Sequence, residues 1–181
     1  MNRRNVLKLA GGALLAAGSA SLVAPSAFAA ASAQSARTVA LLNTHTGDRF
    51  SAAYWEQGNY VPDAMAAIRH VMRDYRNNEV HDIDPRLLDQ LSRLNGLVGA
   101  AAPYQIISGY RSPATNAMLH ANSDGVASHS LHMEGKAIDI RMAGVDLPRL
   151  HDAALSMQSG GVGFYPASDF IHVDTGRVRR W

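Results

Sequence analysis

Residues 128–139 read SHSLHMEGKAID and residues 169–174 read DFIHVD. Gly135 favours a loop that leads from His132 into a strand at residues 136–141. In that strand and in residues 170–174, apolar residues alternate with His or Asp, which is the period-two pattern of a strand with one polar face. Asp139 would project from one face of its strand, opposite to its neighbours Ile138 and Ile140. A charged side chain within a strand needs a partner, and a metal ion is a good one. The two stretches therefore predict strands that carry ligands into a protein interior.

The ligand types restrict the kind of metal site. The chain has no cysteine, so any metal must be bound by nitrogen and oxygen atoms. A catalytic zinc takes three protein ligands and leaves a fourth position open. We predict that His132, Asp139 and His172 bind Zn²⁺, and that Asp174 orients His172, with direct ligation by Asp174 as a lesser alternative. Taken singly, each residue has a plainer interpretation, such as an ion pair between Asp139 and Arg141.

The first 29 residues have the layout of an export signal. Arg3 and Arg4 precede an apolar stretch over residues 9–23, and residues 27–29 (AFA) form a small-x-small cleavage pattern. The paired arginines favour the twin-arginine route, and the general secretory route remains open. The apolar stretch is shorter than the roughly 20 residues that a membrane span needs. We predict a twin-arginine-type signal peptide over residues 1–29, a flexible leader over residues 30–37 and one domain over residues 38–181.

Removal of the signal changes the charge balance of the chain. Residues 1–29 contain three of the 17 Lys and Arg residues and no acidic residue, which leaves 14 basic against 15 acidic side chains. A near-neutral domain has no broad electrostatic footprint for nucleic acid. The remaining chain of about 150 residues suits one domain with one core. We expect a periplasmic monomer without a nucleic-acid partner and without a membrane span after signal removal.

Apolar periodicity predicts an α+β fold. One helix is expected to begin at Pro62, with a stripe that extends to Tyr75, and another at Pro85, which Gly96 and Gly99 help to end. Further helices are expected at residues 114–121 and 147–157, and strands at residues 38–43, 104–108, 136–141, 161–165 and 170–174. A hairpin should follow the first strand. This order predicts a central, mostly antiparallel sheet flanked by helices.

Six residues form an ordered set that resembles the motif of the zinc D-alanyl-D-alanine peptidases, which have a hedgehog-type fold: Ser130, His132, Gly135, Ala137, Asp139 and His172. The match is closer to the murein endopeptidase K (YcbK-like) branch. It extends to residues 42–47 (LNTHTG), 83–85 (IDP), 107–113 (ISGYRSP), 160–163 (GGVG) and 174–181 (DTGRVRRW). The resemblance thus covers nearly the whole predicted domain and implies a hedgehog/D-Ala-D-Ala peptidase-like fold.

The resemblance also implies roles for individual residues. Asp169 corresponds to the general base, although many relatives carry Glu there, and Glu134 is the alternative. Arg111 corresponds to the arginine that polarises the substrate and would stabilise the oxyanion. The plainer interpretation of Arg111 is a structural ion pair in a turn. Further candidates for orienting a ligand or contacting substrate are Asp174, His129, Tyr110 and Ser130.

The implied activity is zinc-dependent hydrolysis of peptide cross-links in peptidoglycan, between two diaminopimelate residues or between D-alanine and diaminopimelate. One alternative is a D,D- or L,D-carboxypeptidase that trims stem peptides. Another is a metal-containing cell-wall-binding module without catalysis. A purely structural metal would have a closed fourth position, filled by His129 or Asp174. The sequence contains no HExxH helix and no Gly-x-Ser-x-Gly elbow, which argues against those two classes of hydrolase.

Overall fold

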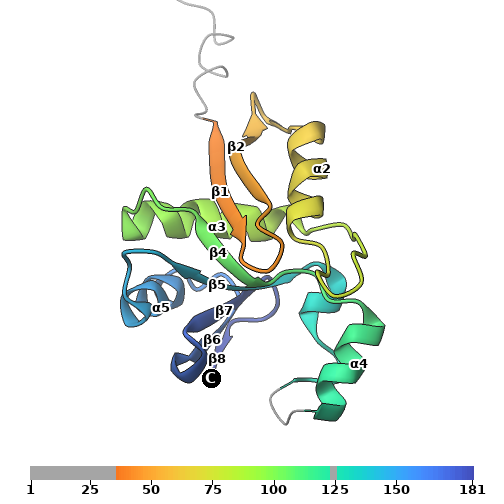
Figure 1. Cartoon of the computed structure of the whole chain (residues 1–181). Coiled ribbons are helices and arrows are strands. Elements are labelled where there is room, and N and C mark those ends of the chain that lie inside the picture. The colour runs from red at the N-terminus through yellow and green to blue at the C-terminus, as the bar shows by residue number, and fades with distance from the viewer. Residues whose placement is uncertain (1–35, 123–125) are drawn as a thin grey trace, which may run out of the picture. The chain divides into compact units, whose positions relative to one another are not determined.

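The computed structural model describes residues 36–122 and 126–181 (Figure 1). The predicted signal peptide lies outside these residues, as does the predicted leader up to residue 35. Arg37, the last residue of that leader, is already the first residue of a strand. No helix within the two described ranges is both long and apolar enough to cross a membrane.

An eight-stranded sheet in the order β3-β2-β1-β4-β5-β7-β6-β8 forms the centre of the fold. Its strands are β1 (Arg37–Asn43), β2 (Arg49–Glu56), β3 (Asn59–Tyr60), β4 (Tyr104–Ser108), β5 (Ala137–Met142), β6 (Gly161–Tyr165), β7 (Phe170–Asp174) and β8 (Arg179–Arg180). The β1–β4 and β6–β8 pairs are parallel, and the other pairs are antiparallel. The predicted hairpin and the mostly antiparallel sheet are confirmed.

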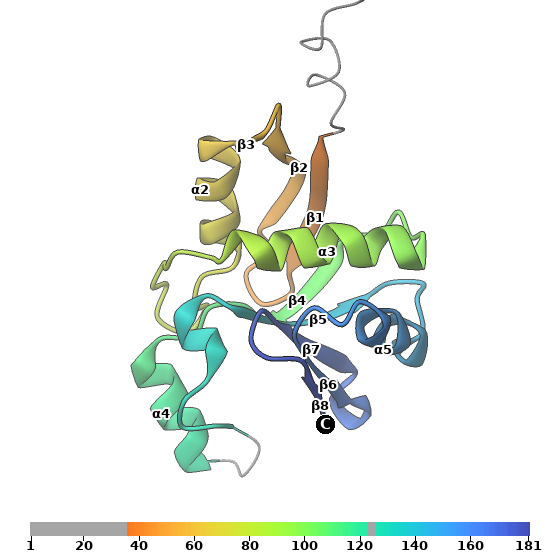
Figure 2. The same cartoon turned by 180° about the vertical axis from the view of Figure 1, so that it is seen from behind.

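In the part of the chain that the structure describes, four α-helices accompany the sheet: α2 (Pro62–Val71), α3 (Pro85–Val98), α4 (Pro113–Asn122) and α5 (Leu147–Ser156). Helix α3 packs against β1 and α5, and α5 also packs against β5, β6 and β7. Figure 2 shows α3 crossing in front of β1 and β4, with α5 beside it. The apolar side chains of α3 are buried in the hydrophobic core: Leu87, Leu88, Leu91, Leu94 and Val98. The predicted α+β class is therefore confirmed.

The predicted end of the first helix is wrong, and of the two glycines expected to end the second helix only Gly99 does so. Helix α2 stops at Val71, so Tyr75 is not on its face and instead stacks on His45 with ring centroids 3.7 Å apart. The carboxylate of Asp74 accepts the backbone N–H of Arg76 at 3.0 Å, and such a bond favours a turn over further helix. Gly96 lies inside α3, which ends only at the left-handed Gly99 (φ 64°).

The two faces of β5 and β7 differ in chemistry. Ile138, Ile140 and Ile171 are fully buried members of the hydrophobic core. Asp139 and His172 alternate with them and project from the other face. Antiparallel pairing places Asp139 directly opposite His172. The same alternation that builds the core thus brings two ionisable side chains together on the opposite face.

Candidate metal centre

His132 reaches the site from a short 3-10 helix, η1 (Leu131–Glu134), that precedes β5. The hydroxyl oxygen of Ser130 caps this helix by accepting the backbone N–H of His132 at 3.3 Å. Gly135 ends it with φ 63°, and a side chain there would collide with the carbonyl oxygen of Asp82. Where a loop was expected between His132 and the strand, the structure has this short helix, followed by Gly135 and Lys136 before β5. Ser130 and Gly135 act by fixing the short helix that carries His132.

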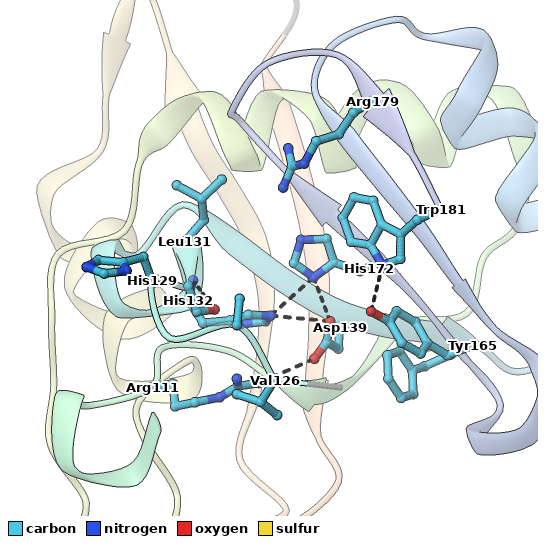
Figure 3. Close-up of a pocket in the computed structure, with 13 residues that line it drawn as sticks. Arg111, Val126, His129, Leu131, His132, Asp139, Tyr165, His172, Arg179 and Trp181 are labelled. Carbon is cyan, nitrogen blue, oxygen red and sulfur yellow. Dashed lines mark hydrogen bonds and ion pairs between the residues drawn. The ribbon is translucent and has the colours of Figure 1, made fainter. Parts of the chain in front are cut away.

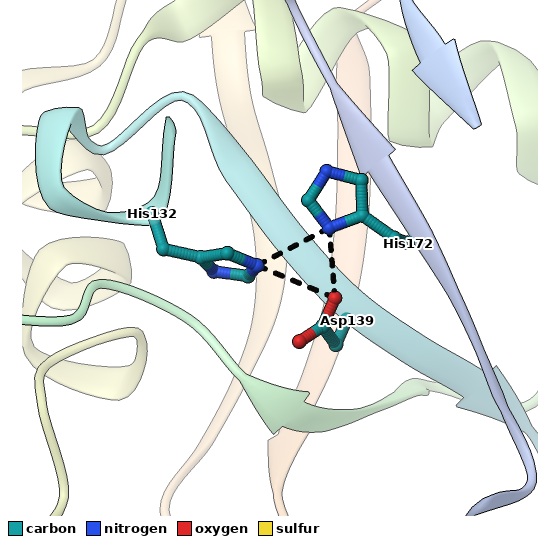
Figure 4. Close-up of side chains that lie close together, drawn as sticks. All are labelled: His132, Asp139 and His172. Carbon is teal, nitrogen blue, oxygen red and sulfur yellow. Dashed lines mark hydrogen bonds and ion pairs between the residues drawn. The ribbon is translucent and has the colours of Figure 1, made fainter. Parts of the chain in front are cut away.

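Three buried side chains converge as potential metal ligands (Figure 4). The Nε2 atom of His132 lies 3.2 Å from Nδ1 of His172 and 3.3 Å from Oδ1 of Asp139. The third side of this triangle, from His172 Nδ1 to Asp139 Oδ1, is 2.9 Å. Three ligands of a tetrahedral zinc at about 2.0–2.1 Å would be about 3.3 Å apart. The three atoms therefore have nearly the spacing of one face of a zinc coordination tetrahedron.

Hydrogen bonds on the far side of each ring orient the two histidines. Nδ1 of His132 lies 2.7 Å from the carbonyl oxygen of Gly109, and that carbonyl can only accept a hydrogen bond. Nε2 of His172 lies 3.0 Å from Oδ2 of Asp174. When these two nitrogens carry hydrogens, the other nitrogen of each ring presents a lone pair. Two lone pairs and the carboxylate of Asp139 then face one another, an arrangement that a cation stabilises.

The shifted pKa values of Asp139 and His172 also indicate a site that favours positive charge. Burial acts to raise the pKa of Asp139, but the charge and hydrogen bonding of His132 and His172 outweigh burial and hold that pKa below its usual value. Burial acts to lower the pKa of His172, yet its contacts with Asp139 and Asp174 raise it. The buried carboxylates thus favour positive charge between them, which either a proton or a metal ion can supply.

Asp174 is the partner that orients His172 and does not lie among the converging atoms. Its side chain is fully buried, and both of its oxygens bind the guanidinium of Arg179, at 3.0 and 2.7 Å. It also accepts the backbone N–H groups of Gly161 and Gly176. With its oxygens occupied in this way, Asp174 is placed to hold the imidazole and not to close the fourth position of a metal.

Replacing Asp174 with asparagine is expected to weaken zinc binding by about 10- to 100-fold. Asparagine keeps the size and an acceptor oxygen, but it lacks the charge that makes His172 a stronger ligand. Competition with a chromogenic chelator would measure the affinity. The matched control is Asp152→Asn, since the Asp152 side chain is 81% exposed. Equal zinc affinities for the Asp174→Asn and Asp152→Asn proteins would contradict the assigned role.

The guanidinium of Arg111 is buried beside the same carboxylate. Its Nη2 atom lies 3.8 Å from Oδ2 of Asp139. The same Nη2 donates to the hydroxyl of Ser108, and Nη1 donates to Oδ1 of Asn116, each at 3.3 Å. Its Nε–H is buried without a hydrogen-bond partner among the described residues. Burial lowers the pKa of Arg111, while the charge of Asp139 acts in the opposite direction. Arg111 is therefore a cation directed at the metal site, as Figure 3 shows.

The two candidate bases are both paired elsewhere. Asp169, with φ 53°, lies just before β7, and its carboxylate binds Arg141 at 2.9 Å. Glu134 binds Lys136 at 2.7 Å. Neither lines the cavity at the metal site. The ion pair of Arg141 is thus with Asp169 and not with Asp139. To act as the base, either carboxylate would have to leave its present partner and turn toward the bound substrate.

Tyr110 and His129 have different surroundings. The hydroxyl of Tyr110 donates to Glu79 at 2.9 Å, and its ring stacks on His81. Burial and this hydrogen bond raise the pKa of Tyr110 to about 12. Tyr110 does not line the cavity, whereas His129 does and is exposed next to Ser128. Of the two, His129 is the one placed to meet a ligand.

A cavity of about 190 Å³ opens at the three converging side chains. Besides Arg111 and His129, its walls include three side chains that sequence reasoning assigned no role, namely Tyr165, Arg179 and Trp181 (Figure 3). The one sequence signal for Arg179 and Trp181 was that they lie in residues 174–181, a segment included in the family resemblance. The arrangement combines a triad that could hold a metal ion, a buried arginine and an open cavity, which suits hydrolysis of a polar substrate.

Comparison with known proteins gives consistent results. Residues 31–181 match the family model described as peptidoglycan L,D-endopeptidase MepK. The chain is 47% identical over 180 residues to the peptidoglycan L,D-endopeptidase MepK of Escherichia coli, covering 99% of this chain and 97% of that protein. A probable peptidoglycan L,D-endopeptidase MepK of Haemophilus influenzae is 41% identical over 181 residues, covering 99% and 95% of the two chains.

Proposed function

The chain belongs to the peptidoglycan L,D-endopeptidase MepK family, and we propose that it hydrolyses peptide cross-links of murein with a zinc ion bound by His132, Asp139 and His172. The observation that supports this proposal most strongly is that the ligand atoms of these three residues lie 2.9–3.3 Å from one another. All three side chains are buried, and their hydrogen-bond partners orient both imidazoles toward one point.

The donor set favours zinc among the divalent ions. Two imidazole nitrogens and one carboxylate are ligands that catalytic zinc sites use. When bound, the metal would lower the pKa of a water molecule and polarise the scissile carbonyl. Arg111 would add positive charge where the oxyanion develops, because its guanidinium is already fixed beside Asp139. Its buried Nε–H has no other partner in the described part of the chain.

Asp169 is the proposed general base, supported by its correspondence with the base of related zinc peptidases. It immediately precedes Phe170, whose side chain lines the cavity. Its ion pair with Arg141 is at the surface, with Asp169 64% exposed, and such pairs are weak. Exchange of this partner on substrate binding would free the carboxylate to accept a proton and pass it to the leaving amine.

The metal position is proposed to be catalytic and not structural. A structural zinc is enclosed by four protein ligands, whereas a catalytic zinc keeps one position open. Neither residue considered as a fourth ligand belongs to the converging group: Asp174 binds Arg179 and His172, and His129 lines the cavity beside Ser128. Within the two described ranges, the group that could hold a metal consists of three residues beside a cavity.

The printed name of the relatives, an L,D-endopeptidase, favours one of the two cross-links considered. A bond from the L-centre of one diaminopimelate to the D-centre of the next is an L,D bond. A bond between D-alanine and diaminopimelate joins two D-centres. We therefore propose the diaminopimelate cross-link as the substrate, with trimming of stem peptides as the second activity to test.

Action on the cell wall requires export. The twin-arginine-type signal over residues 1–29 and the periplasm remain our proposals for the route and the compartment. A monomer is proposed as well, since one chain contributes every residue of the site described above.

Digestion of purified muropeptides by residues 30–181 tests the proposal directly. We expect loss of cross-linked dimers and appearance of monomers, identified by mass, and we expect a chelator to abolish this cleavage and added zinc to restore it. Products shortened by one terminal residue would instead identify a carboxypeptidase. Full cleavage by rigorously metal-free protein would refute the metal mechanism.

A further inference from the structure

Two aromatic side chains without an assigned role form one wall of the cavity. Tyr165 ends β6, and Trp181 directly follows β8. Both line the cavity together with Arg111 and Asp139. In Figure 3, Arg111 and the Tyr165–Trp181 pair lie on opposite sides of Asp139. A peptide bound at the metal site would therefore meet a cation on one side and this aromatic pair on the other.

The indole of Trp181 is fixed in place by backbone and ring contacts. Its backbone N–H donates to Val162 at 3.3 Å, and its carbonyl accepts the N–H of Phe164 at 3.1 Å. The indole lies so close to Gly163 that a Cβ atom there would come within 2.7–2.9 Å of the ring. The guanidinium of Arg179 lies 4.8 Å from the ring centre. Even so, Trp181 is 48% exposed, which leaves an apolar surface open beside His172.

The indole in turn fixes the hydroxyl of Tyr165. The Nε1–H of Trp181 donates to the oxygen of that hydroxyl at 2.7 Å. The Tyr165 ring stacks on Phe170, its cross-strand neighbour, with centroids 4.7 Å apart. The hydroxyl oxygen and the ring of Tyr165 are thus both held before substrate binds. A contact made by this hydroxyl therefore loses little conformational entropy.

The hydroxyl keeps an unused donor. A tyrosine hydroxyl can accept hydrogen bonds and donate one. In the described residues Trp181 is the hydrogen-bond partner of Tyr165, and it uses only the acceptor side. The phenolic hydrogen therefore remains available at the cavity wall. Carbonyl and carboxylate oxygens are the acceptors that a murein peptide offers.

We propose that Tyr165 donates a hydrogen bond to a carbonyl or carboxylate oxygen of the bound murein peptide, and that Trp181 is the positioning residue that holds its hydroxyl. This inference rests on the proposed function and names a substrate contact within the same site. It differs from the roles of Arg111 and Asp169, since it assigns the opposite wall of the cavity to substrate binding.

The Tyr165→Phe protein tests the contact because it loses only the hydroxyl. We expect kcat/KM for cross-linked muropeptide to fall about fivefold to tenfold, mainly through KM, at unchanged zinc content. The matched control is Tyr60→Phe, which removes a tyrosine hydroxyl that binds Asp89 away from the cavity. A Tyr165→Phe protein within about twofold of the control in kcat/KM would overturn the proposal.

The positioning role of Trp181 is tested by a double-mutant cycle. Trp181→Phe keeps an aromatic ring and removes the donor to Tyr165. We expect it to lower kcat/KM in the wild-type background and to have at most about a twofold effect in the Tyr165→Phe background. Equal losses in both backgrounds would show that Trp181 acts through packing alone and would overturn its positioning role.

Calorimetric binding of cross-linked muropeptide to metal-free protein separates this inference from the proposed function. We expect the dissociation constant of Tyr165→Phe to exceed that of wild type by about fivefold. Absence of cleavage by the wild-type zinc protein would refute the proposed function, while the binding comparison would still judge Tyr165. Equal dissociation constants together with normal wild-type cleavage would refute the Tyr165 contact alone.

Discussion

Replacing Asp139 with alanine is expected to lower zinc affinity by more than about 100-fold and to reduce muropeptide cleavage to the level of the chelated protein. Substitution of a residue that only orients a ligand already costs about 10- to 100-fold in metal affinity, so loss of a ligand should cost more. Asp139 is also the negative partner that faces both histidines. Metal analysis after gel filtration and muropeptide digestion would measure the two effects.

The control for this variant is Asp152→Ala, which removes an exposed aspartate from α5. It should bind zinc and cleave as the wild type does. Circular dichroism of both proteins would show whether the fold persists, because Asp139 is buried and its loss leaves His132 and His172 facing each other without the carboxylate that contacts both. A folded Asp139→Ala protein with a full complement of tightly bound zinc would contradict the ligand assignment.

The Asp169→Ala protein is expected to retain zinc and to lose cleavage by about 10²- to 10⁴-fold, the usual contribution of a general base. The expected retention follows from the structure, in which Asp169 is not among the three converging side chains. Its loss frees Arg141 at the surface, where an unpaired arginine is well solvated. Metal content and single-turnover cleavage would separate the two properties.

Two further variants make this result decisive. Arg141→Ala breaks the ion pair but leaves the carboxylate of Asp169, so we expect most cleavage to remain. Glu134→Ala tests the other candidate base, whose present partner is Lys136. If Asp169→Ala cleaves normally and Glu134→Ala does not, Glu134 is the base. Normal cleavage by both variants would refute each assignment.

Local pattern was sufficient for much of the fold. The strands at residues 104–108, 161–165 and 170–174 have the predicted bounds, because they are short apolar runs in a segment that Gly, Ser and Pro residues divide. The end of α2 was wrong because a side chain, Asp74, draws the backbone into a turn that apolar periodicity does not reveal. The two-residue strand β8 was not predicted, since so short a strand exists only through its pairing with β6.

The sequence by itself identified the candidate metal-binding triad, because ligand type, strand alternation and the spacing of His132, Asp139 and His172 are properties of the chain order. Only the tertiary structure decided what surrounds that triad. The pairing of Asp169 with Arg141 and the contact of Trp181 with Tyr165 join segments through sheet register and not through spacing along the chain. Such partners depend on which strands lie next to each other, which no local pattern specifies.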